Sequence, residues 1–523
     1  MLVTDCQKRP MLETTNDPRA GDEARPLPLL FSVFVIAACA IVYELMIATI
    51  SSYLLGDSIY QFSVTIGLFL TSMGIGSYLS RRIHRNLLMA FIAIELLIGA
   101  VGGTSALVLY FTFGALRSIY GPIMYGVIAV IGILVGLEIP ILTRLLSEKY
   151  TLRINIANVL SFDYLGGLLG SLAFPLLLLP YLGLIRTALV VGLLNVGVAG
   201  LVLGSAWRRL PQRRRAAVIL LAVVALLGIG LAHSDTLWQQ LEQQLYRDPV
   251  VYSTQTPYQH ITITQWRDDI RLFLDGNLQF SSLDEYRYHE SLVHPAMAAA
   301  RDRSWVLVLG GGDGLAAREV LKYPDVKQVT LVDLDPQMTG LFKSEPELTK
   351  LNQNSLNDAR VRVVNTDAFK FLEEDTGFYG VILADLPDPR NENLQKLYTV
   401  EFYRLASRRL AAGGVFATQA TSPYFAPEAF WCIYASMQEV WPQTAPYHAS
   451  VPTFGDWGFI VASQARLNPD DLKLAVPTRF LDAPTLRSLF VFPADMPTLQ
   501  EQPNSMIQPV LPGYYREGWR EAH

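Results

Sequence analysis

Cysteine and charge are both scarce in this chain of 523 residues. It has only 3 cysteines, too few for a disulfide framework and at no metal-ligand spacing: Cys6, Cys39 and Cys432. Charged residues make up 17% of the chain and hydrophobic residues 51%. That balance excludes a disordered chain and fits poorly with a purely soluble globular protein. The sequence therefore predicts no zinc or iron–sulfur site and favours a chain with a membrane-embedded part.

The few charges are divided unevenly along the chain. Residues 27–232 contain 13 basic and 6 acidic residues, whereas residues 233–523 contain 25 basic and 36 acidic residues. Binding to nucleic acid needs clustered Lys and Arg to neutralise phosphates, so the acidic second half argues against a nucleic-acid partner. An acidic domain suits a cationic substrate better.

Apolar runs of membrane-spanning length fill the first half. We place seven of them, at 28–50, 61–80, 87–111, 120–143, 155–180, 183–205 and 216–232. Each approaches the ~20 residues that cross a bilayer core as a helix, and the last run is the shortest. The first run begins late and six others follow, so we expect no signal peptide and interpret residues 1–27 as a flexible cytoplasmic head. The sequence predicts a multi-pass α-helical domain over 28–232 in the cell (inner) membrane, with the lipid bilayer as its partner.

Basic residues are distributed unevenly among the loops between these runs. Eleven of them follow the second, fourth and sixth runs, whereas the alternate loops hold only Arg117 and Arg186. The positive-inside rule places the head and the basic loops in the cytoplasm, so seven crossings would leave the C-terminal half outside. The side of that half depends on whether 216–232 crosses.

Acidic residues lie inside four of the apolar runs: Glu44, Glu95, Glu138 and Asp163. A charge at that depth costs a few kcal/mol, so we expect these side chains to face the bundle interior. Two interpretations stay open. The acids could form a site or path for a cation or proton, or they could pair helices, with Glu138 marking a kink before Pro140.

The second half has the pattern of a soluble α/β domain. After a linker at 233–248, strand-like segments at 258–263 and 271–274 predict a small antiparallel β subdomain within 249–300. Over 301–523, short apolar runs alternate with helical segments. This alternation predicts a doubly wound, Rossmann-like parallel sheet, similar to that of class I methyltransferases, with ligands at the C-terminal strand ends.

Acidic residues stand at those strand ends. They are Asp313, in the glycine-rich loop 310–314 after the first strand, and Asp333, Asp367, Asp385 and Asp388 at the ends of later strands. We expect all of them to converge on one crevice. A glycine loop followed by an acid that ends the second strand is typical of sites for NAD or for an S-adenosyl compound.

Asp313 narrows this choice. The third glycine of a dinucleotide motif is replaced by Leu315 or Ala316, and the Asp313 carboxylate would face a pyrophosphate, which disfavours NAD. S-adenosylmethionine carries a carboxylate that Asp313 would repel, whereas the decarboxylated donor has only an ammonium there. Opposite charges at ~4 Å are worth a few kcal/mol, enough for discrimination.

Several motifs of this half occur in a fixed order. They are Tyr258 to Ile261, Leu274 to Gly276 with Gln279, Asp284 to Glu290 with His294-Pro295, Gly310 to Gly314, Arg318 to Lys322, Asp385 to Pro389, and Pro452 to Phe459. In this series the sequence resembles the polyamine aminopropyltransferases, the spermidine synthases, over roughly 250–465. The first half resembles the membrane-anchored subset of that family more loosely.

The resemblance implies a reaction and a set of site residues. It implies transfer of an aminopropyl group from decarboxylated S-adenosylmethionine to a diamine such as putrescine, giving spermidine and 5′-methylthioadenosine, with no metal or other cofactor. Asp385 would be the catalytic base. The implied thioadenosine-binding residues are Gln259, Asp333, Asp367 and Ala368, and the implied aminopropyl- and amine-binding residues are Tyr288, His289, Asp313, Asp388 and Gln419. The family's dimers and tetramers suggest a homo-oligomer without fixing its size.

Three departures from the family pattern leave the acceptor amine open. Asp333 replaces the usual Glu, Leu386-Pro387 replaces a pair that is commonly small and polar, and Phe454 stands where Tyr is frequent. Structural roles are expected elsewhere, at Asp275 in a turn, at Asp284 as a helix cap and at His294.

Asp367 has a structural alternative too, as a strand-end turn. For the whole protein, two other functions stay open. One is an S-adenosylmethionine-dependent methyltransferase-like enzyme, and the other is a polyamine-binding or transport-coupled membrane protein.

Overall fold

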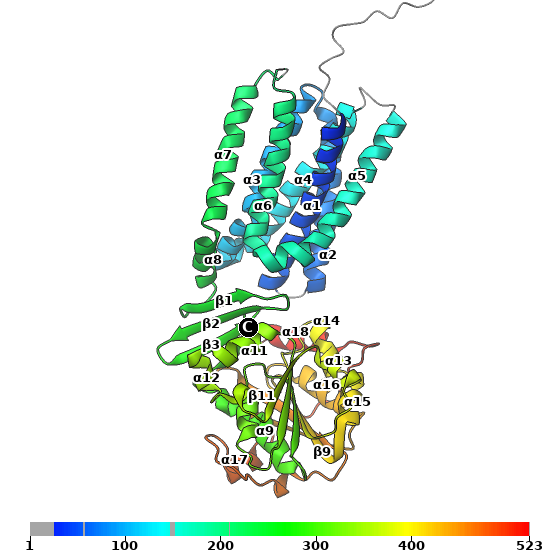
Figure 1. Cartoon of the computed structure of the whole chain (residues 1–523). Coiled ribbons are helices and arrows are strands. Elements are labelled where there is room, and N and C mark those ends of the chain that lie inside the picture. Colours follow the sequence, from blue (N-terminus) through cyan, green and yellow to red (C-terminus); the bar gives the residue numbers. More distant parts are fainter. Residues whose placement is uncertain (1–25, 56–57, 147–151, 209, 522–523) are drawn as a thin grey trace, which may run out of the picture. The chain divides into compact units, whose positions relative to one another are not determined.

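The computed structural model describes residues 26–55, 58–146, 152–208 and 210–521 (Figure 1). The predicted head at 1–27 lies outside these ranges except for its last two residues. The chain divides into two compact units, a helical unit that includes Phe62–Trp238 and an α/β unit that includes Gln239–His523. Each unit is described by itself below.

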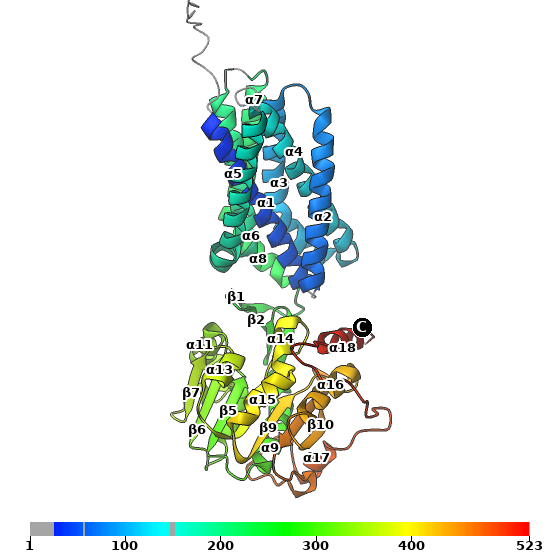
Figure 2. The same ribbon diagram turned by 90° about the vertical axis from the view of Figure 1, so that its right-hand side faces the viewer.

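Long apolar helices make up the first unit, and in both views they run side by side (Figures 1 and 2). They are α1 (Pro26–Leu55), α2 (Ser58–Leu79), α3 (Leu87–Ala115), α4 (Tyr120–Leu146), α5 (Leu152–Ala173), α6 (Leu179–Ser205) and α7 (Arg213–Ala232). Among the described residues, six segments are long and apolar enough to cross a membrane, and one of them, Ile156–Ser205, has 50 residues. That segment holds the fifth and sixth predicted runs, which a break at Gly183, with φ of 68°, divides. The shortest predicted run is part of the continuous 20-residue helix α7.

Small residues let some of these helices approach closely. A Cβ on Gly166 of α5 would lie 2.2 Å from the backbone oxygen of Phe34 in α1, and one on Gly170 would lie 2.6 Å from that of Ala38. No larger side chain fits at such a contact. The sequence Gly166-Gly167-x-x-Gly170 therefore sets the distance between α1 and α5.

Two of the four acids of the apolar runs meet inside the helical unit. Glu95 of α3 and Glu138 of α4 are 0% and 1% exposed and lie close enough for their charges to affect each other, but none of their carboxyl oxygens has a hydrogen-bond partner among the described residues. Glu44 is also buried, whereas Asp163 is not among the buried residues. Pro140 lies within α4, which continues past Glu138 to Leu146, and the kink expected at this point stays a prediction. Glu95 and Glu138 thus lie near each other between α3 and α4, and both interpretations of these acids stay open.

The α/β unit begins with a four-stranded antiparallel sheet in the order β1-β2-β3-β4. Its strands are β1 (Val250–Gln255), β2 (His260–Trp266), β3 (Asp269–Leu274) and β4 (Asn277–Ser281), and helix α8 (Ser234–Gln243) precedes them. Asp275 and Gly276 have φ of 48° and 75° and form the two-residue turn between β3 and β4. The predicted antiparallel sheet and the turn role of Asp275 are confirmed.

A seven-stranded sheet follows, in the order β10-β11-β9-β8-β5-β6-β7. Its strands are β5 (Trp305–Gly310), β6 (Gln328–Asp333), β7 (Val361–Asn365), β8 (Tyr379–Asp385), β9 (Leu410–Gln419), β10 (Gln443–Val451) and β11 (Gly455–Ser463). The pairings among β5 to β9 are parallel, which confirms the predicted Rossmann-like sheet. The sequence did not predict the antiparallel hairpin β10–β11 that extends the sheet beyond β9.

Helices cover both faces of this sheet. They are α9 (Glu285–Ala299), α10 (Leu315–Leu321), α11 (Pro336–Ser344), α12 (Pro346–Leu351), α13 (Ala368–Glu374), α14 (Glu392–Gln395), α15 (Val400–Arg409), α16 (Pro427–Gln438), α17 (Ala483–Ser488) and α18 (Leu511–Glu521). Val306 and Val308 of β5 belong to one apolar cluster, and Leu307 and Leu309 belong to another, as expected for a strand buried on both faces. The strand order reverses between β5 and β8, so the loops that follow these two strands flank the crevice where such sheets bind ligands.

Candidate active site

The glycine loop after β5 is held against the ends of two neighbouring strands. Gly310 has φ of 80°, and a Cβ there would lie 2.0 Å from the backbone oxygen of Asp385. The amide of Gly311 donates a hydrogen bond of 3.1 Å to that oxygen, and the amide of Gly312 donates one of 3.0 Å to Asp333 Oδ2. Only residues without a side chain allow so close an approach. The loop therefore brings the ends of β5, β6 and β8 together.

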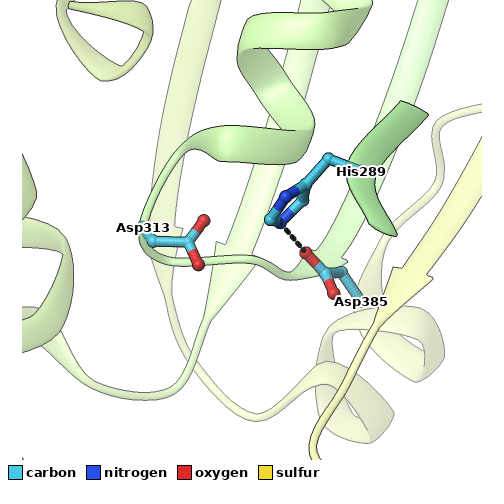
Figure 3. Close-up of side chains that lie close together, drawn as sticks. All are labelled: His289, Asp313 and Asp385. Atoms are coloured by element: carbon cyan, nitrogen blue, oxygen red, sulfur yellow. Dashed lines mark ion pairs between the residues drawn. The ribbon is translucent and has the colours of Figure 1, made fainter. Parts of the chain in front are cut away.

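His289, Asp313 and Asp385 form a trio at this point, in which His289 and Asp313 are buried and Asp385 is partly buried (Figure 3). Each offers one possible ligand atom, and these atoms all lie within 4.8 Å of one another. His289 Nε2 is 3.8 Å from Asp385 Oδ2, and the phenol of Tyr288 donates a hydrogen bond of 2.8 Å to Asp385 Oδ1. Asp313 Oδ1 accepts a hydrogen bond of 2.9 Å from the amide of Leu315, at the start of α10. Three of the predicted amine-binding residues, Tyr288, His289 and Asp313, thus lie together with the predicted base Asp385.

The surroundings of His289 favour its protonated, positively charged form. Burial alone lowers the pKa of an imidazole, but Glu285, whose Oε2 is 2.8 Å from His289 Nδ1, and the charges of Asp385 and Asp313 raise the pKa of His289 to about 9. Arg318 in turn holds Glu285, with bonds of 2.8 and 2.9 Å to its two oxygens. An imidazolium has no free lone pair for a metal ion. The protonated form of His289 therefore opposes metal binding, although the spacing of the three residues would allow it.

Negative charge in the site is not fully balanced. Burial, opposed by the charge of His289, raises the pKa of Asp313 to about 7, and burial also raises the pKa of Asp385. Burial likewise raises the pKa of Asp333 and that of Asp388, each to about 6. Each of these carboxylates would be stabilised by an added positive charge. The site is built to receive a cation.

Asp388 lies in the loop after β8, with a donor on each oxygen. The amide of Gln419 donates a hydrogen bond of 3.2 Å to Oδ1, and the phenol of Tyr515 donates one of 2.8 Å to Oδ2. Gln419 also donates to the backbone oxygen of Leu386 at 2.8 Å, and the phenol of Tyr398 donates to that of Pro387 at 2.9 Å. The structure thus joins the predicted residues Asp388 and Gln419. Tyr398 and Tyr515 were missed, because tyrosines far along the chain give no local signal of such contacts.

Gln259 and Asp333 meet through Asp335. Asp335 Oδ2 accepts a hydrogen bond of 3.1 Å from Gln259 Nε2 and one of 2.7 Å from Thr256 Oγ1. The amide of Asp335 donates one of 2.9 Å to Asp333 Oδ1. The sequence reasoning overlooked Asp335, although an acid directly before Pro336 is a typical helix-cap signal.

Asp367 is engaged by its own helix and by a lysine. Its Oδ1 accepts hydrogen bonds of 2.8 and 3.2 Å from the amides of Phe369 and Lys370, and its Oδ2 pairs with Lys396 Nζ at 2.7 Å. Ala368 is the first residue of α13 and is 9% exposed. These contacts match the alternative of a strand-end turn. The thioadenosine-binding role of both residues stays a prediction.

Two further structural expectations have different outcomes. Asp284 takes the cap position of α9, but its Oδ2 accepts a hydrogen bond of 2.7 Å from the amide of Thr453 and none from the helix amides. The expected side-chain cap is therefore wrong. His294 is buried, with Nδ1 at 2.9 Å from the Tyr323 phenol and Nε2 at 3.0 Å from Glu319, which confirms a structural role.

Comparison with known proteins agrees with this geometry. Residues 285–472 match the spermine/spermidine synthase domain. The chain is 47% identical over 501 residues to polyamine aminopropyltransferase 2 of Ralstonia nicotianae, covering 94% of this chain and 98% of that protein. It is 46% identical over 500 residues to a polyamine aminopropyltransferase of Leptospira interrogans, with 94% and 98% covered. A solved spermidine synthase in complex with the transition state analogue AdoDATO is 27% identical, with a TM-score of 0.44, and the match covers 47% of this chain and 85% of that one.

Proposed function

This chain belongs to the polyamine aminopropyltransferases, and on that premise we propose that it transfers an aminopropyl group from decarboxylated S-adenosylmethionine to a diamine such as putrescine. The products would be spermidine and 5′-methylthioadenosine. The observation that carries the proposal is the trio of His289, Asp313 and Asp385, with Tyr288 bonded to Asp385. Its uncompensated negative charge suits two cationic substrates.

In this proposal the donor lies along the glycine loop. Asp313 attracts the ammonium of the aminopropyl chain and repels the carboxylate of ordinary S-adenosylmethionine. Gln259, Asp333, Asp367 and Ala368 hold the thioadenosine part. The acceptor lies on the other side of the trio, where Asp388, oriented by Gln419, binds its distal ammonium and Tyr288 and His289 flank the chain.

The proposed chemistry is a direct displacement. The neutral primary amine of the acceptor attacks the aminopropyl carbon next to the sulfonium, a C–N bond forms, and the C–S electron pair passes to sulfur. The amine loses one proton to Asp385, and neutral 5′-methylthioadenosine leaves without a general acid. The enzyme contributes alignment of the reactants and a base. Burial raises the pKa of Asp385, which makes it a stronger base than a free aspartate.

We further propose that the reaction uses no metal ion. The ligand spacing of the trio alone would allow a metal, but the charge on His289 opposes one. Activity should therefore be the same with and without a strong chelator.

The helical unit, in this proposal, spans the cell membrane, with the C-terminal half outside. In Figure 1, α2, α4 and α6 finish at one end of the helical unit, and α7 finishes at the other end. Arg186, near the start of α6, pairs with Asp235, just after α7, at 2.5 Å. This contact supports an α7 that runs the length of α6 in the opposite direction, as a seventh crossing would require.

The test uses the purified full-length protein. It is incubated with putrescine and either decarboxylated or ordinary S-adenosylmethionine, and the products are identified by mass spectrometry. We expect equal amounts of spermidine and 5′-methylthioadenosine with the decarboxylated donor, unchanged by EDTA. A methylated amine with S-adenosylhomocysteine would support a methyltransferase instead, and amine binding without turnover would support a polyamine-binding protein.

A further inference from the structure

The last helix of the chain reaches the loop that carries Asp388. Helix α18 (Leu511–Glu521) lies beyond the segment 285–472 that matches the family's domain. From this helix the phenol of Tyr515 donates its hydrogen bond of 2.8 Å to Asp388 Oδ2, while Gln419 occupies Oδ1. A carboxylate with a donor on each oxygen has a fixed orientation. Residue 515 thus contacts a carboxylate 127 positions earlier in the chain.

A second contact joins α18 to the same network. The indole nitrogen of Trp519 donates to Thr421 Oγ1 at 3.4 Å, and the amide of Thr421 donates to Gln419 Oε1 at 2.9 Å. Gln419 is the other donor to Asp388. One helix therefore acts on both oxygens of this carboxylate, directly through Tyr515 and indirectly through Trp519.

Close packing fixes the place of α18. A Cβ on Gly518 would lie 2.5 Å from Cα of Ala426, so the helix backbone lies directly on the start of α16. The ring of Trp519 is 5.4 Å from that of Phe425 and 6.3 Å from that of Trp457. These contacts fix the position of α18 against the start of α16.

Aromatic contacts continue from α18 to the trio. The ring of Trp457 is 5.1 Å from that of Phe454, which is 6.3 Å from that of Tyr288. Tyr288 donates to Asp385. Phe454 stands where the family resemblance leads one to expect a tyrosine. Phe454 keeps the aromatic ring of a tyrosine but lacks its hydroxyl group.

Resting on the proposed function, we propose that α18 completes the acceptor site and that Tyr515 is a positioning residue, which orients Asp388 toward the distal ammonium of the diamine. The phenol that position 454 lacks is supplied to the acceptor carboxylate from the C-terminal helix. Because α18 holds Asp388 in one orientation, it also sets the distance between the attacking amine of the diamine and the ammonium that binds Asp388. We therefore expect α18 to determine the length of diamine that is accepted.

Loss of the Tyr515 phenol should also change the pH dependence of diamine binding. Burial raises the pKa of Asp388, and Tyr515, Arg390 and Gln419 each lower it. Two other phenols, those of Tyr288 and Tyr398, interact with the same carboxyl. Without Tyr515, the pKa of Asp388 rises further. Asp388 then loses its negative charge at a higher pH, so binding of the dicationic diamine begins to weaken at a higher pH.

The experiment compares Tyr515→Phe with Tyr514→Phe in the full-length protein. Tyr514 is the adjacent residue of the same helix and packs against the same apolar core, but its phenol interacts with Glu501. We expect Tyr515→Phe to raise the KM for putrescine ~10-fold, the effect of one hydrogen bond to a charged group. The kcat and the donor KM should change less than about twofold. The acid limb of kcat/KM for the amine should move to higher pH, and the preference between putrescine and cadaverine should weaken.

The possible outcomes separate this inference from the proposed function. If the parent enzyme makes spermidine and Tyr515→Phe behaves like Tyr514→Phe, the role of α18 is wrong while the function stands. Equal increases in the KM values of donor and amine, with an unmoved pH profile, would indicate a general structural effect and also overturn it. If Tyr515→Phe no longer binds 5′-methylthioadenosine and so has lost its fold, Trp519→Phe takes its place. That variant should raise the amine KM alone, by a smaller factor, and an unchanged amine KM would count against the proposal.

Discussion

The phenol of Tyr288 donates a hydrogen bond of 2.8 Å to Oδ1 of Asp385. Burial and the charge of Asp385 raise the pKa of Tyr288 well above 10, so this phenol stays protonated and can only donate to the carboxylate. The bond lowers the pKa of Asp385, against the burial that raises it. Tyr288 thereby fixes the direction of the proposed base and favours its deprotonated form.

Replacing Tyr288 with Phe should shift the pH profile of turnover. Without the phenol the pKa of Asp385 rises, and because the base must be deprotonated, the acid limb of kcat moves to higher pH. We expect kcat near pH 7 to fall ~10-fold and to recover partly near pH 9. Tyr434→Phe is the matched control, since that phenol accepts a bond from Gln438 on α16. An unmoved acid limb in Tyr288→Phe would show that Tyr288 does not act on the base.

Asp313→Asn should relax the choice of donor. The amide oxygen can still accept the bond from the amide of Leu315, so the loop keeps its shape while the negative charge is lost. We expect the affinity for decarboxylated S-adenosylmethionine to fall at least ~10-fold and the penalty on ordinary S-adenosylmethionine to lessen. Isothermal titration with both donors measures the ratio. The same ratio in variant and parent would place donor discrimination elsewhere.

A reporter fused after His523 should behave as extracytoplasmic. The reason is the distribution of charge, with eleven basic residues after the second, fourth and sixth apolar runs and two in the alternate loops. Alkaline phosphatase fused there should be active, and a cytoplasmic fluorescent protein should stay dark. The reverse pattern would place the α/β unit in the cytosol and α7 in the interface.

The strand ends of the site could be predicted because their signals are local. A glycine-rich loop after a buried strand, and acids directly after the later strands, follow from the geometry of parallel sheets. The sequence alone therefore predicts that Asp313, Asp333 and Asp385 lie at one edge of the sheet. It also identified the turn at Asp275, where an acid followed by glycine allows two residues with positive φ.

Contacts between distant segments could not be predicted in this way. Asp284 has the sequence context of a helix cap, yet its carboxylate bonds to Thr453, 169 positions away. The Asp284 carboxylate bonds to this residue of the β10–β11 hairpin instead of capping its own helix, and the partner is present only in the folded protein. Tyr515 is the same kind of case, since nothing near it in the sequence indicates that its phenol meets Asp388.

Asp385→Asn is the most direct test of the proposed base. The amide keeps the size of the side chain and can still accept the Tyr288 bond, but it cannot take a proton from the amine. Enzyme loaded with decarboxylated S-adenosylmethionine is mixed with saturating putrescine, and 5′-methylthioadenosine is measured in a single turnover. We predict a rate about 10²–10⁴-fold below that of the parent, with an unchanged dissociation constant for 5′-methylthioadenosine. Equal single-turnover rates for variant and parent would contradict the assignment of Asp385 as the base.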